Sequence, residues 1–469
     1  MKIDTEKILK DFTSFINNLK KINEPHLGSF CFPIDKIESI KYIDELSANY
    51  NDIFLFRTPE NRIAVTGLNS ALEIKPDTDR FSSVFNQLIY WKNNLIKNWD
   101  EINFGWPKII CFAAKFDPVK SSELWSDFES IKVFIPEFIF SFENNNSAAF
   151  FNFMINDDKE IGFISDKFLQ YLKLIEKLNE KSAVDLKAKI NSILTSGKKD
   201  VTEWQNTFDE SMDYLKREEV EKLVLSRVYG FNVPNPSNWT NLLLKLLVRF
   251  NDCYTFFTKR NSSVFFGSSP EMFLKVEGKI AEVESVAGSA PRSKKPVTDT
   301  KYEKFLQSSE KNRQEHIFVS KFISDILIQY SDKVKIIEEK QIRKLDNIQH
   351  LITRISAELN NKTNILELID SLFPTPAVCG VPKEKAMQLI RNLEKHDRGL
   401  YSGLIGLMDF NGGCELAVSI RSALVKDNVV YAFAGAGLIK SSNSEEEFFE
   451  TELKLNTILS LFRDERKSK

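Results

Sequence analysis

The sequence predicts an α+β protein with antiparallel sheets, and three observations lead to this prediction. Runs with strand-like alternation mostly follow one another through short turns, as strands do in antiparallel sheets. Longer stretches with apolar residues three and four positions apart indicate helices between these groups of strands. No glycine-rich phosphate loop or dinucleotide fingerprint is present, so a parallel nucleotide-binding sheet is not expected.

The composition excludes several classes of protein. The 469 residues are 42% hydrophobic and include 64 basic and 66 acidic side chains, so we expect a large core but no nucleic-acid or membrane partner. The chain has no apolar run of about 18 residues and no secretory signal, which predicts a cytoplasmic protein. Five scattered cysteines without a Cys-x-x-Cys pair indicate reduced thiols and no zinc site.

In the first half, short strands are expected to precede a charge-rich helical crossover. The predicted strands are Ser29–Pro33, Asp52–Arg57, Arg62–Leu68, Ile109–Phe116 and Val133–Phe142. One predicted helical region lies near the start of the chain and another at Phe81–Asn98. The crossover is predicted to contain the helices Tyr171–Leu178, Val184–Ile193 and Val201–Tyr214.

In the second half, strands are expected to alternate with longer helices. The predicted strands are Lys222–Phe231, Cys253–Lys259, Ser263–Ser268, Glu271–Glu277, Leu404–Phe410, Cys414–Val425 and Asn428–Ala434. The predicted helices are Trp239–Phe250, Tyr302–Tyr330, Ile348–Glu358, Ile365–Leu372, Lys383–Lys395 and Glu445–Phe462.

Two of these helices carry acidic residues in line with an apolar stripe. On Tyr302–Tyr330 the stripe starts at Val319, and one turn earlier the same side presents Glu315 and then Asn312. A carboxylate in line with a buried face must be paired or metal-bound, because burying it alone costs a great deal of free energy. The alternative is that the buried stripe ends at Val319 and Glu315 is solvated.

The last helix shows a related pattern, because Glu447, Glu450 and Lys454 share one side. The simpler interpretation is a capping box between Ser444 and Glu447 and an exposed ion pair between Glu450 and Lys454. Two helices that present oxygen ligands at one point instead indicate a Mg²⁺ site with few protein carboxylates.

The segment that precedes the last helix has features of an anion site. Arg421 lies on one face of the strand Cys414–Val425, with Ile420 on the other, and its guanidinium suits bidentate binding of a carboxylate. The small residues Gly435, Ala436 and Gly437 are predicted to form a turn whose bare N–H groups approach a ligand. A tight turn beside a solvated strand face is the alternative.

Lys222 lies on an apolar strand face together with Val224 and Val228. A lysine in such a position usually extends to the edge of the sheet and keeps its charge in water. If it is instead desolvated, it can lose its proton and serve as a base.

Nine segments, in this order, resemble the chorismate-utilising enzymes, which include isochorismate, salicylate, anthranilate and aminodeoxychorismate synthases. They are Lys222-Leu-Val-Leu-Ser-Arg227, Phe266-Gly-Ser-Ser-Pro-Glu271, Ala287-Gly-Ser-Ala-Pro-Arg292, Gln314-Glu-His316, Gln349-His-Leu351, Phe373-Pro-Thr-Pro-Ala-Val378, Arg398-Gly-Leu-Tyr-Ser-Gly403, Ala434-Gly-Ala-Gly437 and Glu450-Thr-Glu-Leu-Lys454. The resemblance implies one large α+β domain of two stacked antiparallel sheets flanked by helices. Residues 206–465 would form the chorismate-binding catalytic region, and the divergent residues 1–205 would pack into the same fold.

The resemblance also implies the roles of individual residues. Lys222 would be the general base that activates water, and Glu271 the general acid that protonates the leaving hydroxyl. Glu315, Glu450 and Glu447 would bind Mg²⁺, although Asn312 stands where an acidic residue is common in the family. Contacts with the substrate are implied for Arg421, Gly435, Ala436, Gly437, Lys454, His350, Tyr401, Ala287, Gly288, Ser289 and Val378.

Three features resemble the isochorismate synthase group, which moves the hydroxyl of chorismate from C4 to C2. Lys222 replaces the glutamine of the ammonia-using enzymes, and Ala287 replaces the lysine nucleophile of the aminodeoxychorismate type. The loop Pro374–Pro382 is similar to that of the isochorismate group. We therefore expect a monomer without a glutamine amidotransferase subunit. The alternatives are a salicylate synthase, which also eliminates pyruvate, and a chorismate-binding subunit with weak activity.

Overall fold

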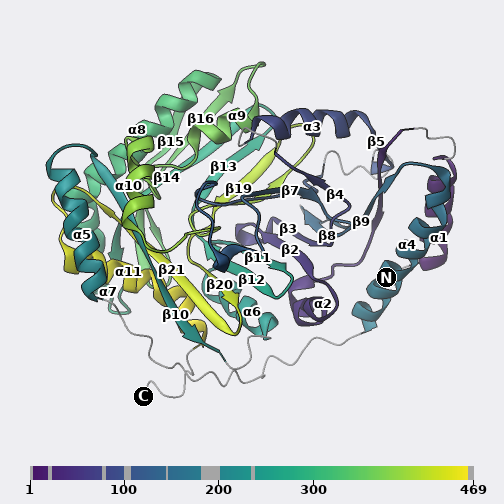
Figure 1. Ribbon diagram of the computed structural model, residues 1–469, viewed down its shortest axis with the longest axis horizontal. Helices are drawn as coiled ribbons and strands as arrows, with labels where there is room; N and C mark the ends of the chain where they lie inside the picture. Colours follow the sequence, from purple (N-terminus) through teal and green to yellow (C-terminus); the bar gives the residue numbers. More distant parts are fainter. Residues whose placement is uncertain are drawn as a thin grey trace.

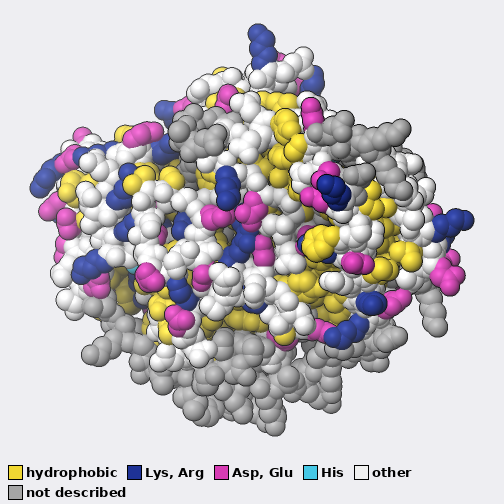
Figure 2. Space-filling model, turned by 45° about the vertical axis from the view of Figure 1, so that its right-hand side comes forward, with side chains coloured by type: hydrophobic (Ala, Val, Ile, Leu, Met, Phe, Trp, Pro, Cys, Tyr) yellow, Lys and Arg dark blue, Asp and Glu magenta, His cyan; other side chains and the backbone are white. Residues whose placement is uncertain are grey.

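The computed structural model describes residues 4–19, 24–76, 81–99, 107–143, 146–180, 201–233 and 238–462. Within these ranges the strands form one sheet of twelve and one of nine, with helices around them (Figure 1). No helix in the described part of the chain is long and apolar enough to cross a membrane. On the face drawn in Figure 2, basic and acidic side chains are intermixed, in keeping with the nearly balanced charge of the sequence.

The larger sheet has the strand order β17-β10-β21-β20-β12-β11-β2-β3-β8-β9-β1-β5, and its pairs are antiparallel except β1 with β5. Its strands are β1 (His26–Pro33), β2 (Asp52–Arg57), β3 (Ile63–Leu68), β5 (Leu95–Lys97), β8 (Phe138–Glu143), β9 (Asn146–Ile155), β10 (Lys222–Asn232), β11 (Tyr254–Arg260), β12 (Ser263–Ser269), β17 (Gly380–Val381), β20 (Ser422–Lys426) and β21 (Val429–Leu438).

The smaller sheet is antiparallel, with the order β15-β16-β14-β13-β19-β18-β6-β7-β4. Its strands are β4 (Leu72–Ile74), β6 (Ile110–Ala114), β7 (Ile131–Ile135), β13 (Met272–Glu277), β14 (Ile280–Pro291), β15 (Ser331–Lys344), β16 (Ile348–Leu359), β18 (Leu404–Met408) and β19 (Cys414–Val418). The helices are α1 (Thr5–Asn17), α2 (Ile43–Asn49), α3 (Ser82–Asn93), α4 (Ile161–Glu180), α5 (Val201–Lys216), α6 (Trp239–Arg249), α7 (Pro296–Ser308), α8 (Glu310–Tyr330), α9 (Ile365–Leu372), α10 (Lys383–Leu393) and α11 (Ser444–Leu459).

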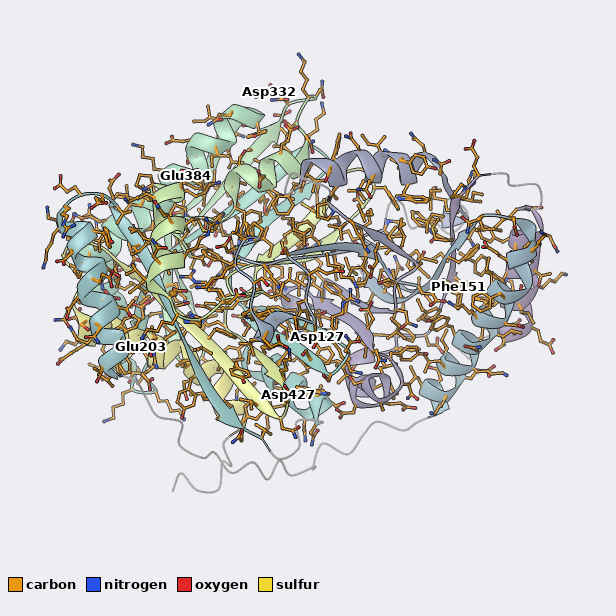
Figure 3. The ribbon with its side chains drawn as sticks, in the orientation of Figure 1. Asp127, Phe151, Glu203, Asp332, Glu384 and Asp427 are labelled. Atoms are coloured by element: carbon orange, nitrogen blue, oxygen red, sulfur yellow. The ribbon has the colours of Figure 1, made fainter. Side chains whose placement is uncertain are left out.

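The two sheets are stacked face to face. Strands of the larger sheet that also have helices packed on their outer face are buried on both faces. In β2, Phe54 and Phe56 belong to the core that also contains Phe112 of β6 in the other sheet. The alternate residues Ile53 and Leu55 belong to a second core, on the outer face, which is built with α1, α4, α6 and α11. Side chains fill the layer between the sheets in Figure 3.

Each sheet contains strands from both halves of the sequence. In the larger sheet β2 pairs with β11, and in the smaller sheet β6 pairs with β18. The chain therefore forms one domain with two continuous sheets, as the resemblance implied.

Two predictions in the first half of the chain were wrong, one in the middle of the element and one at its end. The predicted strand Val133–Phe142 is two strands in different sheets, β7 and β8, because the chain leaves one sheet at Pro136 and Glu137. Proline cannot donate to the ladder, so a strand is easily interrupted there. The predicted helix Phe81–Asn98 ends at Asn93, and Leu95–Lys97 forms β5. The predicted helix Val184–Ile193 lies outside the described residues.

Predictions in the second half of the chain were also wrong. Ile348–Glu358, predicted as a helix, is strand β16, and its neighbours β14 and β15 were not predicted. Its apolar residues happen to be three and four positions apart, and the buried polar residues Gln349, His350 and Thr353 interrupt the alternation that would mark a strand. The predicted helix Tyr302–Tyr330 is split into α7 and α8 at Ser309, whose side chain caps α8.

Candidate active site

A cavity of about 60 Å³ lies where β10 and β21 of the larger sheet approach β14 and β16 of the smaller one, beneath α8 and α11. Fourteen of the sixteen residues predicted for the site line it. They are Lys222, Glu271, Ala287, Gly288, Ser289, Glu315, His350, Val378, Tyr401, Arg421, Gly435, Gly437, Glu450 and Lys454.

The remaining two, Ala436 and Glu447, do not line the cavity. Ala436 lies between Gly435 and Gly437 in a strand, so its side chain points to the opposite face, where it joins the core. Glu447 is 1% exposed and forms an ion pair with Lys311 behind the cavity wall.

The glycine-containing segment is the end of strand β21, not the predicted turn. β20 pairs with β21 only at Val429–Ala432, so the following residues leave one edge for other groups. The carbonyl oxygen of Gly435 on this segment accepts a hydrogen bond of 2.8 Å from Lys454 Nζ. A strand edge therefore does what was expected of a turn: it brings bare backbone close to the site.

Lys222 is the first residue of β10 and is fully buried, so it does not extend to solvent. Its Nζ lies 3.1 Å from Glu315 Oε1 on α8. Gly437 makes this approach possible, because a Cβ atom there would lie 2.0 Å from Glu315 Oε1. The alternative that Glu315 is solvated was wrong, since this residue is 8% exposed.

Glu271 immediately precedes β13 and is 3% exposed. Burial, followed by the neighbouring charge of Glu284, raises the pKa of Glu271 to about 8, although Lys222, Lys454 and Arg421 act in the opposite direction. The carboxyl group therefore carries a proton at neutral pH and is able to donate it.

Arg421 is brought into the cavity by a break in the predicted strand Cys414–Val425. The chain forms β19 and β20 instead, and Arg421 between them has a left-handed backbone with φ of 52°. Because regular alternation ends there, Ile420 and Arg421 both line the cavity instead of facing opposite sides. No glycine or proline interrupts the segment, so nothing in the sequence predicted this break.

A chain of hydrogen bonds connects Arg421 with Glu450. Arg421 Nη2 donates to His350 Nε2 at 2.9 Å. A guanidinium can only donate, so His350 carries its proton on Nδ1, which faces Ser289 Oγ at 3.1 Å. Ser289 Oγ in turn donates to Glu450 Oε1 at 3.0 Å. Burial and the charge of Arg421 hold the pKa of His350 well below its usual value, which agrees with a neutral ring.

The three carboxylates of the predicted metal site are each paired with a lysine. Besides Glu315 with Lys222 and Glu447 with Lys311, Glu450 Oε1 lies 2.6 Å from Lys454 Nζ. In the described residues no three acidic, histidine or cysteine side chains are grouped closely enough to hold a metal as they stand.

The donors nevertheless suit Mg²⁺ in kind. All are carboxylate oxygens, the ligands that this ion prefers. Burial and the nearby charge of Glu450, with that of Glu315, raise the pKa of Glu447, so the negative charges are close enough to repel one another. A cation among them would relieve this repulsion, as the lysines do in this structure.

The start of α11 differs from the predicted capping box. The N-cap is Asn443, whose side chain accepts from the backbone N–H groups of Glu445 and Glu446. Glu447 is thereby released from a capping role and turns inward.

Behind the cavity wall, the buried residue Arg398 connects the loop that contains Val378 with strand β10. Arg398 donates to the carbonyl oxygens of Val378 at 2.7 Å and of Val224 at 2.8 Å, and it forms a bidentate pair with Glu394. The loop that contains Val378 is thus fixed to the strand that contains Lys222. Neither Arg398 nor Glu394 was singled out as a site residue, and neither lines the cavity.

Residues 14–463 match the family model described as chorismate binding enzyme. The chain belongs to this family. Among the relatives of this chain, isochorismate synthase MenF of Bacillus subtilis (strain 168) is 25% identical to it over 467 residues, 98% of each chain. Anthranilate synthase component 1 of Saccharolobus solfataricus is 32% identical over 258 residues, 54% of this chain and 61% of that relative.

Among solved structures, MenF, the menaquinone-specific isochorismate synthase from Escherichia coli, matches with a TM-score of 0.76 and 20% identity. The match covers 98% of this chain and 100% of the other. This likeness confirms the predicted fold of two stacked sheets flanked by helices.

Proposed function

We propose that the protein is an isochorismate synthase, which adds water at C2 of chorismate and removes the hydroxyl at C4. The observation that carries the proposal is a buried lysine, Lys222, in the same cavity as a buried carboxyl group, Glu271, with a pKa of about 8. The likeness to an isochorismate synthase over 98% of both chains supports the same reaction.

The reaction needs one base and one acid. Lys222 accepts a proton from water while the water oxygen bonds to C2 and the ring double bonds shift. Glu271 donates its proton to the C4 hydroxyl, which leaves as water. One water enters and one leaves, so the atoms balance, and a proton must pass from the lysine back to the glutamate before the next turnover.

Glu315 and Glu450 would hold Mg²⁺, with Glu447 in support. The ion would supply positive charge against the carboxylates of a dianionic substrate. The cavity is smaller than most ligand sites. The ion pairs of Lys222 with Glu315 and of Lys454 with Glu450 must therefore separate before the substrate can enter. Release from the ion pair leaves Lys222 free to face the attacking water, and Arg421 binds a substrate carboxylate.

Water, and not ammonia, is the proposed nucleophile, because Lys222 and Ala287 occupy the positions that distinguish the isochorismate group. Because it does not use ammonia, the protein needs no amidotransferase subunit. We expect it to act as a monomer in the cytoplasm. Residues 206–465 carry the catalytic groups, and residues 1–205 complete the fold.

Chromatography of the products made from chorismate tests the proposal. We expect isochorismate only when Mg²⁺ is present, and no anthranilate when ammonium salts are added. Full activity in EDTA would contradict the metal site, and stoichiometric salicylate and pyruvate would show a salicylate synthase instead. If chorismate is bound but not converted, the protein is a binding subunit.

A further inference from the structure

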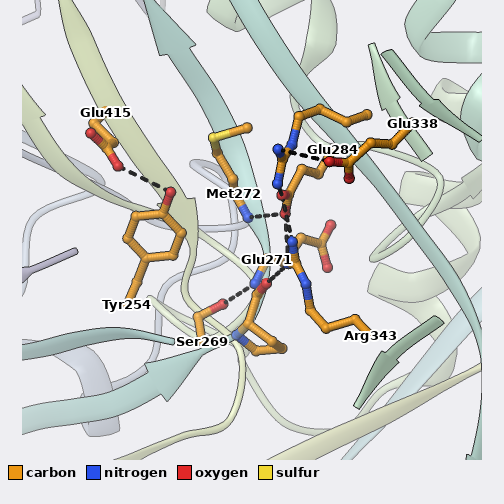
Figure 4. A network of polar contacts seen from close by, with 10 residues as sticks. Tyr254, Ser269, Glu271, Met272, Glu284, Glu338, Arg343 and Glu415 are labelled. Atoms are coloured by element: carbon orange, nitrogen blue, oxygen red, sulfur yellow. Dashed lines mark hydrogen bonds and ion pairs between the residues drawn. The ribbon is translucent and has the colours of Figure 1, made fainter. Parts of the chain in front are cut away.

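Glu284 on β14 is a buried acidic residue that the proposed chemistry does not use. It is 4% exposed, and two arginines hold its carboxylate (Figure 4). Arg343 on β15 forms a bidentate pair with it, at 2.8 Å through Nη1 and 2.6 Å through Nη2. Arg354, directly opposite on β16, donates to the same carboxylate at 3.2 Å. Two guanidinium groups therefore bind this one carboxylate.

This pair also holds the backbone on both sides of Glu271. The N–H group of Met272 donates to Glu284 Oε2 at 3.3 Å, and Arg343 Nη1 donates to the carbonyl oxygen of Pro270. The peptide groups that flank Glu271 are therefore tied to one ion pair, as the dashed lines in Figure 4 show. The pair lies on two strands of the smaller sheet and is well placed to fix where the Glu271 side chain begins.

We propose that Glu284, together with Arg343, positions the general acid: the pair clamps the backbone at Glu271 and keeps a negative charge beside its carboxyl group. The inference rests on the proposed function, in which Glu271 is that acid. Glu284 does not line the cavity, so it acts through Glu271 and not on the substrate.

The charges around Glu271 agree with this role. Three cations favour the ionised carboxylate of Glu271, which could not donate a proton. They are Lys222 on β10, Lys454 on α11 and Arg421 between β19 and β20. Glu284 supplies a negative charge that opposes these three cations. Burial and this charge together account for the pKa of about 8.

The simplest alternative is that the ion pair only stabilises the sheet. Glu284→Gln separates the two roles, because the amide keeps the shape of the side chain but removes its charge. We expect the basic limb of the pH profile of kcat/KM to move down by about one pH unit, since Glu271 would lose its proton more easily. KM for chorismate is expected to change little, because the substrate does not touch Glu284.

Glu338→Gln is the matched control. Glu338 also binds Arg354, at 3.3 Å, but it is exposed and is absent from the groups that shift the pKa of Glu271. The control is expected to leave the pH profile unchanged. A uniform loss of activity in Glu284→Gln without movement of the limb would leave only a structural role and overturn the proposal.

Arg343→Lys tests the clamp separately and serves if Glu284→Gln does not fold. A lysine keeps the positive charge, but it lacks the planar fork that reaches the carboxylate and the Pro270 carbonyl together. We expect kcat to fall roughly tenfold or more, the basic limb to stay in place, and KM to change little. Unchanged kcat in a folded Arg343→Lys protein would contradict the clamp.

An infrared titration without substrate distinguishes failure of this inference from failure of the proposed function. The carbonyl band of the protonated acid is assigned by its loss in Glu271→Gln. It is expected to titrate near pH 8 in the unsubstituted protein and at lower pH in Glu284→Gln. An equal midpoint in both proteins would overturn the inference, whether or not chorismate is converted.

Discussion

At the scale of single residues, burial keeps the proton on Glu271, and Lys222 lies in the same cavity as this acid. Glu271 is surrounded by protein and keeps its proton to about pH 8. Lys222 is equally buried, and its ion pair with Glu315 is the interaction that a substrate must disturb. The two side chains line one cavity, but Lys222 lies on the larger sheet and Glu271 in the link between the two sheets.

Removal of either group is expected to slow turnover strongly. Lys222→Ala and Glu271→Gln should each lower kcat by roughly 10²–10⁴, the usual contribution of general acid–base catalysis. Steady-state kinetics with chorismate, together with circular dichroism to show that the variants are folded, measures this effect. Near-normal turnover in a folded variant would assign its side chain another role.

The pKa of Glu271 also makes a prediction about stability. Its folded-state pKa, about 8, is above the ordinary 4.5, so the folded state binds the proton more tightly. The resulting stabilisation is complete below about pH 4.5 and is lost as the pH rises through 8. In Glu271→Gln, the free energy of unfolding should therefore fall less steeply between these pH values than in the unsubstituted protein. Urea unfolding at several pH values measures both slopes, and parallel slopes would contradict the assignment.

At the scale of elements, strand β21 and helix α8 approach one another closely enough to require a glycine. Gly437→Ala would place a Cβ atom 2.0 Å from Glu315 Oε1 and 3.0 Å from Lys222 Cε. Both side chains must move, so we expect kcat to fall by about 10² or more.

Gly230→Ala on the adjacent strand β10 is the matched control for this change. Its new Cβ would come only within 3.7 Å of the Tyr431 ring, an ordinary contact, so activity should be nearly unchanged. Steady-state kinetics of both variants decides, and equal activities would show that the close approach at Gly437 is not needed.

The sequence was a good guide to elements with one apolar face and a poor one elsewhere. Helix α8 was located by its stripe, but the stripe left open whether Glu315 is buried or solvated, and the residue is buried. Strand β16 was mistaken for a helix, because buried polar residues interrupt the alternation that marks a strand.

The same limit applies to the site. Lys222, Glu271 and Glu450 lie in recognisable motifs, and all line the cavity. Glu284 and Arg343 come from strands β14 and β15, which had not been predicted, and their pairing depends on strand register. Strand β16 lies between β14 and β15, so the contact depends on the register of two strand pairs, and none of these three strands had been predicted.

At the scale of the whole molecule, the two halves of the sequence should not fold separately. Residues 206–465 alone would leave the edges of β11 and β18 without β2 and β6. Unpaired edges and exposed apolar faces promote aggregation. We expect this fragment to be insoluble when expressed alone and to be recovered on co-expression with residues 1–205. Gel filtration and circular dichroism would test this, and a folded, soluble fragment would contradict it.

The interleaved sheets also have a consequence during synthesis on the ribosome. Strand β2 is complete at Arg57, but its partner β11 begins only at Tyr254, about two hundred residues later. Translation proceeds at roughly 5–20 residues per second, so the edge of β2 that pairs with β11 stays unpaired for about ten seconds or more. Over that interval the nascent chain is a natural client for chaperones, and synonymous codon changes that slow translation between the two strands should increase the fraction of chains lost to aggregation.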